Sequence, residues 1–233
     1  MKKKSSVGEN NPQNAAGTAQ TVAIQAIQQE IINVRIIGDT PVITHPWSEK
    51  AKKQMLEAMM KENVVAEREP KNPVAEFIDS CYWIEGKPEE KTEEAFDAAI
   101  ANGARFGIRA ESFKEAAAAA VYRLGWVKNK VEIKSSFFIE GIQVGGDQLV
   151  EIHSDPPVMR EDIVRIGMGK PDLRYRPEFD HWYADLTIKL TANGKFTAQD
   201  IVNAINAGGY ACGVGEWRPE KGGQFGMFHV QTA

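Results

Sequence analysis

The chain has 233 residues, of which 42% are hydrophobic and 26% charged, the composition of a globular protein with one good core or two small ones. Its formal net charge of −4 does not favour nucleic-acid binding, so any such binding needs a local basic patch. No apolar run approaches the roughly 18 residues of a transmembrane helix, and the basic start lacks the apolar segment of a secretory signal. We expect a cytoplasmic protein without membrane contact.

Reactive side chains in the sequence do not follow the spacing of known catalytic or metal sites. Cys81 and Cys212 lie far apart without CxxC spacing, which indicates two buried thiols in a reducing cytosol. The four histidines show neither HxxxH nor HExxH spacing, and the sequence contains no GxSxG motif. We therefore expect no catalytic residues, no metal and no cofactor, and a protein that is not an enzyme.

The first 20 residues are rich in Lys, Ser, Asn, Gln, Gly and Ala and offer little to bury. We expect residues 1–30 to form a flexible N-terminal arm and residues 31–233 to form a single α+β domain. Such an arm could order against a partner or a neighbouring subunit.

The first half of the predicted domain mixes strands and helices. The β-branched segment that ends at the first Gly-Asp turn is typical of a strand. Ser48 is placed to cap a helix with methionines on one side and lysines on the other, and Thr92 is placed to cap a helix that stops at Asn-Gly. We expect strands at 31–38 and 75–86, and helices at 49–62 and 93–101.

An alanine-rich helix dominates the middle of the chain. It follows a short apolar entry within 106–125, and five consecutive alanines give it high helix propensity and a slim surface. Segments 135–144 and 148–154 are predicted strands joined by a Gly-Gly-Asp turn. The next segment, 155–179, contains four prolines and five basic residues, and we expect an irregular basic insertion there.

The C-terminal part gives the clearest pattern. Residues 181–192 alternate between apolar and polar, which predicts a half-buried strand. Thr197 and Asp200 have capping-box spacing and open a helix expected to end at the glycine pair 208–209, before a last strand at 225–230. With the earlier strands and helices, this order predicts an α+β fold whose ferredoxin-like or RRM-like core has an antiparallel sheet and packed helices.

A glycine-rich segment, NAGGYACGVGEWRPEKGGQFGMF, spans residues 206–228. It follows a helix and lacks the third glycine of a GxGxxG fingerprint, and no GK[ST] pattern occurs, so nucleotide cradling is not expected. Its glycines permit close approach to a phosphodiester backbone, to a neighbouring subunit or to the protein's own sheet. Trp217 would stack on bases if exposed and would belong to the core if buried, while Arg218 and Lys221 supply two cations.

A second candidate lies at Arg174-Tyr175-Arg176. In an extended chain the two guanidinium groups lie on one face about 7 Å apart, close to the phosphate spacing along one strand of nucleic acid. Alternatively, these cations belong to a solvated loop and pair with the acids interleaved around them, namely Glu161, Asp162, Asp172, Glu178 and Asp180.

Two segments carry a family resemblance. Residues 108–114, Ile-Arg-Ala-Glu-Ser-Phe-Lys, precede the alanine-rich helix and look like an I-P-x-S-x-K-G-A-L entry, with Arg109 in place of proline and Glu115 in place of glycine. This entry and the glycine-rich segment resemble those of the RAMP superfamily, the RRM-like, RNA-binding backbone proteins of CRISPR effector complexes. Through "DLRYRPEF" and "GVGEWRPEKGG" the chain also resembles uncharacterised proteins of tailed bacteriophages.

The RAMP resemblance implies an RRM-like core that multimerises along single-stranded nucleic acid. It places Ser112 and Lys114 near the nucleic-acid backbone and the glycine-rich segment beside the sheet.

The leading hypothesis is a non-enzymatic, self-associating protein that binds single-stranded DNA or RNA and is encoded by a phage. Phosphates would be neutralised by cations and bases would stack on aromatic side chains. The proposed contacts are Arg109, Ser112, Lys114, Arg174, Tyr175, Arg176, Trp217, Arg218 and Lys221.

Two alternatives remain open at this point. A structural or assembly protein of a phage particle, which uses the N-terminal arm for subunit contacts, suits the acidic charge and the lack of catalytic motifs equally well. The second alternative is a defence-related protein that imitates a subunit of a host complex.

Overall fold

The computed structural model describes residues 26–46, 70–166 and 170–232, with positions 52, 55, 56, 59 and 60 in between. Of the predicted helix 49–62, the described positions 52, 55, 56 and 59 are helical, and the remainder, with its cap Ser48, lies outside the described residues. The predicted arm likewise lies outside them up to residue 25. Its end needs correction, because the first strand already begins at Gln29.

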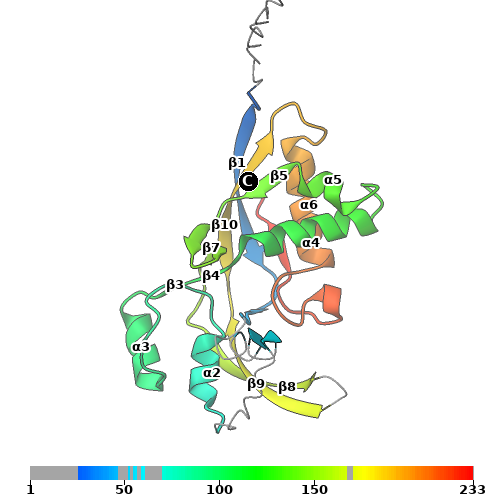
Figure 1. Cartoon of the computed structure of the whole chain (residues 1–233). Helices are drawn as coiled ribbons and strands as arrows, with labels where there is room; N and C mark the ends of the chain where they lie inside the picture. Colours follow the sequence, from blue (N-terminus) through cyan, green and yellow to red (C-terminus); the bar gives the residue numbers. More distant parts are fainter. Residues whose placement is uncertain are drawn as a thin grey trace, which may run out of the picture.

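The first sheet, which we call the core sheet, has the strand order β11-β1-β10-β5 with all neighbours antiparallel. Numbered by their order along the chain, its strands therefore lie 4-1-3-2. Figure 1 shows helices α4, α5 and α6 together on one side of β1 and β10. The elements are β1 (Gln29–Gly38), α4 (Ala110–Arg123), α5 (Lys130–Lys134), β5 (Phe137–Ile139), β10 (Tyr183–Thr191), α6 (Ala198–Ala211) and β11 (Phe228–Val230).

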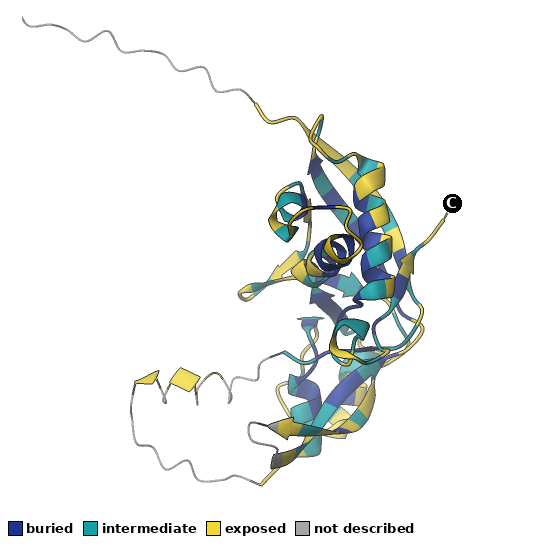
Figure 2. Ribbon diagram, turned by 90° about the vertical axis from the view of Figure 1, so that its right-hand side faces the viewer, coloured by how far each residue is buried: buried dark blue, intermediate teal, exposed yellow. Residues whose placement is uncertain are grey.

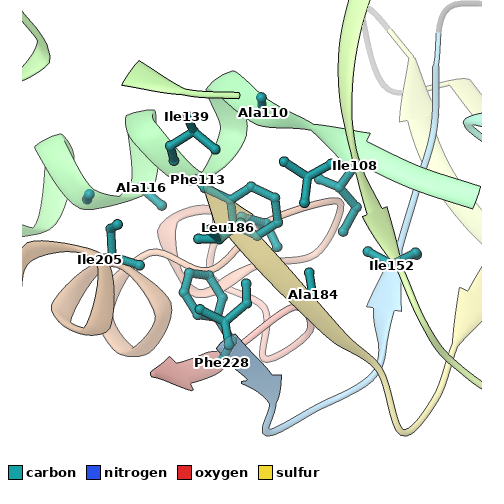
Figure 3. Packing of buried hydrophobic residues seen from close by; sticks show 14 of the residues in the cluster. Ile108, Ala110, Phe113, Ala116, Ile139, Ile152, Ala184, Leu186, Ile205 and Phe228 are labelled. Atoms are coloured by element: carbon teal, nitrogen blue, oxygen red, sulfur yellow. The ribbon is translucent and has the colours of Figure 1, made fainter. Parts of the chain in front are cut away.

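Strand β10 supplies the centre of the core. Its predicted alternation is confirmed, because every second side chain from Trp182 to Leu190 is at most 3% exposed. Figure 3 shows Leu186 of this strand among Phe113 of α4, Ile205 of α6 and Phe228 of β11. Burying such side chains stabilises the fold by about 1.5–3 kcal/mol each.

Helices α4 and α6 pack with their backbones close together. The alanines at 116–120 are all at most 4% exposed, and a Cβ added to Gly208 would lie 2.6 Å from the Ala117 nitrogen. The predicted capping box at Thr197 is confirmed. The expected helix end at 208–209 is wrong, because these glycines lie in the helix–helix and helix–strand contacts and α6 continues to Ala211.

The second sheet has the order β3-β4-β7-β6, and β4 runs directly into α4. The predicted single strand 75–86 is wrong in its first half, because the Asn72 side chain accepts a hydrogen bond from the Ala75 amide (3.1 Å) and caps a helix instead. The predicted strand 135–144 is divided between two sheets. The strands of the second sheet are β3 (Trp83–Glu85), β4 (Arg105–Arg109), β6 (Ile142–Val144) and β7 (Asp147–Ile152). The helices in this part of the chain are α2 (Pro73–Asp79) and α3 (Glu93–Ala101).

The third sheet joins β2 (Val42–Ile43), β9 (Lys170–Phe179) and β8 (Val158–Ile166) in the order β2-β9-β8. Strands β8 and β9 form an antiparallel hairpin, from Val158 opposite Glu178 to Ile166 opposite Lys170. The predicted irregular insertion 155–179 is therefore wrong. Two of its prolines precede β8, and the other two, Pro171 and Pro177, are accommodated within the pairing of β9 with β8. We call β8 and β9 the hairpin; it lies at the lower end of the molecule in Figure 1.

Candidate nucleic-acid interface between helix α4 and the glycine-rich loop

The glycine-rich loop, residues 212–227, connects α6 to β11 and is held by backbone hydrogen bonds. The Val214 amide donates to the Gly226 carbonyl (2.9 Å), and the Glu216 amide donates to the Ile43 carbonyl (2.8 Å). Gly226 has φ +66°, and a Cβ there would lie 1.8 Å from the Val214 oxygen. Packing of the loop on itself and on β2 therefore accounts for much of its glycine content.

A pocket of about 320 Å³ lies between the start of α4 and this loop. It brings together three of the nine predicted site residues, Arg109, Ser112 and Arg218. The first turn of α4 also has amide groups without intrahelical partners, and the Arg109 side chain, at the N-cap position, does not cap them. The remaining lining residues are Glu111, Glu115, Ala116, Gly213, Val214, Gly215 and Glu220.

Arg109 comes from the end of β4 and enters the pocket with one donor unsatisfied. Its guanidinium forms an ion pair with Glu111, and its Nε lies 3.3 Å from Asp147 Oδ1. That Nε is nevertheless buried and without a hydrogen-bond partner within the described part of the chain. A buried donor of this kind costs about 1–3 kcal/mol when it is left unpaired.

Arg218 enters the pocket from the loop side. It donates to the Gly215 carbonyl (2.9 Å) and forms an ion pair with Glu220 (3.1 Å). Arg123 of α4 donates to the same carboxylate (3.0 Å), so Glu220 joins the loop to the helix. Burial alone would raise the pKa of Glu220, but the hydrogen bond from Arg218 and the nearby positive charges outweigh it and lower that pKa.

The pocket is not a basic patch. Two arginines face three glutamates in its lining, and both arginines already form ion pairs. An anionic ligand must therefore replace carboxylates as partners of the guanidinium groups. Guanidinium is suited to such an exchange because its five N–H donors match the geometry of phosphate as well as of carboxylate.

Trp217 and Lys221 lie in the same loop, outside the lining of the pocket. Trp217 is 40% exposed and has φ +51°, a conformation that is rare for a bulky residue. Its carbonyl accepts a hydrogen bond from the Phe225 amide (3.1 Å), which fixes this turn. Lys221 is exposed at the end of a short 3-10 helix, η1 (Pro219–Lys221). The Trp217 side chain is therefore partly accessible to a ligand, whereas the backbone turn that carries it is fixed.

Lys114 lies on α4 but outside the pocket lining. Its ammonium sits over the ring of the exposed Phe138, 4.2 Å from the centroid. Burial lowers the pKa of Lys114, with Lys134 adding to this effect. The structure therefore separates Lys114 from Arg109 and Ser112, its neighbours in the sequence motif.

The predicted contacts Arg174, Tyr175 and Arg176 lie in the hairpin, in a different sheet from the core. Arg176 is only 6% exposed and pairs with Asp162 (3.4 Å). Arg174 pairs with Asp172 (2.9 Å), and the Tyr175 hydroxyl donates to Glu161 (2.7 Å). These cations pair with the acids interleaved around them, as the alternative from the sequence predicted, but they do so in a hairpin and not in a solvated loop.

One further surface was not identified from the sequence. On the side of the core sheet facing away from α4 and α6, Arg35 forms a two-pronged pair with Asp185 (2.8 Å for both bonds) and lies over the Tyr183 ring. His153 stacks on that ring at 4.7 Å. The sequence could have indicated this surface through the outward-facing positions of two strands with alternating patterns. Which of these side chains lie next to each other depends on the register of the strands, which the sequence does not give.

Within the described ranges, no group of three or more His, Cys, Asp or Glu side chains is arranged to hold a metal ion. The helices of that same part of the chain include none that is both long and apolar enough to cross a bilayer.

Comparison with solved structures gives distant similarities, among them one to a CRISPR-associated protein. No family model and no curated protein matches the sequence. The crystal structure of Cmr6 from Pyrococcus furiosus is similar over 88% of this chain and 100% of that one, with 9% identity and a TM-score of 0.32. A similarity at this score and identity leaves the resemblance to RAMP proteins a prediction from the sequence.

Proposed function

We propose that this chain binds single-stranded nucleic acid without catalysing a reaction, and that it self-associates. We also propose that the core sheet with α4 and α6 is a ferredoxin-like, RRM-like core. The strand order 4-1-3-2, with α4 preceding the second strand and α6 preceding the fourth, supports this assignment.

The observation that carries the binding proposal is the pocket itself, which brings Arg109 of the strand end and Arg218 of the loop together. The Arg109 Nε lies 3.3 Å from Asp147 Oδ1 but makes no hydrogen bond within the described part of the chain. A phosphate in the pocket could replace Glu111 as the partner of the Arg109 guanidinium, and Arg218 on the opposite wall could contact the same group or its neighbour. The free amides at the start of α4 would add to the attraction, because a helix N-terminus carries partial positive charge.

Trp217 extends the proposed site beyond the pocket. Its ring is partly exposed one residue before Arg218, so a base attached to a phosphate in the pocket has a stacking partner nearby. Stacking of this kind contributes about 1–3 kcal/mol per base. Lys221 adds a cation on the same loop, and its contact with the backbone would be salt-sensitive.

The acidic side chains of the pocket compete with a phosphate for the arginines. Binding requires Glu111 and Glu220 to release their arginines, so we expect weak affinity that falls steeply with salt. On a single strand the logarithm of the affinity should fall by about 0.7 per decade of salt for each phosphate contacted.

Fluorescence anisotropy with a labelled single-stranded oligonucleotide, as DNA and as RNA, tests the proposal over a range of salt concentrations. We expect Arg109→Gln and Trp217→Ala each to weaken binding by about tenfold. Arg35→Gln is the matched control, because Arg35 is also a paired arginine but lies on the other side of the core sheet. Circular dichroism confirms that each variant folds.

Two results would contradict the proposal. If binding of both DNA and RNA is undetectable or independent of salt, the proposed nucleic-acid-binding function is wrong. Binding that depends on Arg35 and not on Arg109 moves the interface to the open face of the core sheet and makes the pocket assignment wrong. Origin from a phage, and the virion alternative, stay predictions from the sequence alone.

A further inference from the structure

Strand β8 is the edge of its sheet and leaves one side of its backbone unpaired. Strand β9 pairs with it along its whole length, and no described strand pairs with the other side. It has nine residues, whereas the other strands at the ends of the three sheets, β2, β3, β5, β6 and β11, have two or three. Long free edges promote pairing with another chain.

The side chains of β8 also fit a docking surface better than a solvent-facing edge. Ile163 is 71% exposed, and Met159, on the same face of β8 because side chains alternate along a strand, is 39% exposed. Ile163 lies directly opposite Leu173 of β9, which is itself 37% exposed. Figure 2 shows exposed ribbon over much of this end of the hairpin. Apolar side chains gathered along an unpaired edge indicate a surface that a partner covers.

We propose that β8 pairs antiparallel with β8 of a second copy of this chain, about a two-fold axis at Ile163. This register places the two Ile163 side chains opposite each other. It also places Glu161 of each copy opposite Arg165 of the other, so that two ion pairs flank the axis. Opposite residues of an antiparallel pair lie on the same face, where such pairs stabilise the sheet.

Charge complementarity selects this register over the next best one. An axis at Glu161 would place Arg160 opposite Asp162 of the other copy, but these two residues already pair within one chain at 2.8 Å. That register also sets Glu161 against its own copy, and like charges directly opposite each other are unfavourable. The axis at Ile163 leaves the internal ion pairs intact and joins the two hairpins into one continuous sheet.

This inference names the surface for the self-association proposed above and rests on that part of the proposed function. It is tested without nucleic acid, so its failure leaves the oligonucleotide binding to be judged separately. Sedimentation equilibrium should show a reversible dimer of the full chain. Ile163→Lys should weaken the dimer by at least about tenfold, since two lysines then meet at the axis.

Val158→Lys is the matched control, because Val158 is exposed to a similar degree (67%) but lies on the opposite face of β8 and outside the paired register. It should leave the dimer unchanged. Arg165→Glu should weaken the dimer, and Glu161→Arg combined with Arg165→Glu should restore it. A chain that is monomeric at every concentration, or a dimer that Ile163→Lys does not weaken, overturns the proposal.

Cysteine cross-linking tests the register itself. Both native cysteines are buried, so an introduced thiol reports on the new position. Under mild oxidation Ile163→Cys should give a covalent dimer, because residues on the axis have Cα atoms within about 6 Å, and Glu161→Cys should give far less. Stronger cross-linking through Glu161→Cys than through Ile163→Cys overturns the axis at Ile163.

Discussion

The core sheet and the hairpin distribute polar and apolar side chains in opposite ways. In β10 of the core sheet, Leu186 is 1% exposed against the helices, while Asp185 faces outward. In β8 of the hairpin, Asp162 is 7% exposed and Ile163 is 71% exposed. Strand β10 thus buries its apolar side chain and exposes its charged one, whereas β8 buries the charged side chain and exposes the apolar one.

The difference follows from what covers each sheet. Helices α4 and α6 cover the apolar inner face of the core sheet, and alanines and glycines let the two helices pack closely on each other and on β11. The hairpin buries Arg176, which pairs with Asp162, and half-buries Arg160, which lies over the Phe225 ring at 4.7 Å. Charged groups buried in this way depend on their partners, whereas apolar groups depend on shape.

Removal of a buried carboxylate should have the largest effect. Asp162→Ala leaves Arg160 and Arg176 without their shared partner, and we expect a loss of about 3–5 kcal/mol in the free energy of unfolding. Asp185→Ala is the matched control: it breaks an exposed arginine pair on the core sheet and should change stability little. Urea denaturation of both variants measures the difference. Equal losses would mean that the hairpin pair is no more buried in solution than the exposed one.

A methyl group added between the two helices should have the next largest effect. Gly208→Ala places a Cβ 2.6 Å from the Ala117 nitrogen, and we expect a loss of about 1–3 kcal/mol. Gly146→Ala adds the same group where no atom lies within 4 Å, and it should be nearly neutral. Thermal unfolding compares the two. A neutral Gly208→Ala would contradict the close packing of α4 and α6.

A smaller effect should appear as pH dependence near the hairpin. Burial lowers the pKa of His45 from 6.5 to about 4, and repulsion by Arg176 and Arg174 adds to the shift. In the unfolded chain His45 takes up a proton below pH 6.5, whereas in the folded chain it stays neutral down to about pH 4. The stability of the fold therefore falls as the pH drops through this range. His45→Gln should lose less stability between pH 7.5 and 4.5 in urea denaturation. An unchanged pH profile would show that His45 is not buried beside these arginines.

The fold was predictable from sequence where burial follows a regular period. The alternation of β10 and the capping box of α6 both express local rules, and both predictions are confirmed. The hairpin was missed because the four prolines of residues 155–179 suggest irregular structure and because two of its buried residues, Asp162 and Arg176, are charged. Its register depends on partners far along the chain, such as Arg176 opposite Arg160.

The candidate site was predictable only in part. The sequence identified Arg109, Ser112 and Arg218, which the structure brings together. It grouped them with Arg174 and Arg176, whose place in another sheet follows from tertiary pairing. The acids that line the pocket were missed, because residue type alone does not reveal which carboxylate a guanidinium will face.

The most direct test of the central claim is the molar mass of the full chain with and without a single-stranded oligonucleotide, by size-exclusion chromatography with light scattering. We expect the mass to rise by bound oligonucleotide at low salt and to return to the protein-only value at high salt. Arg109→Gln should show a reduced rise at low salt. A mass that stays unchanged at low salt for the unmodified chain with DNA and also with RNA would contradict the account.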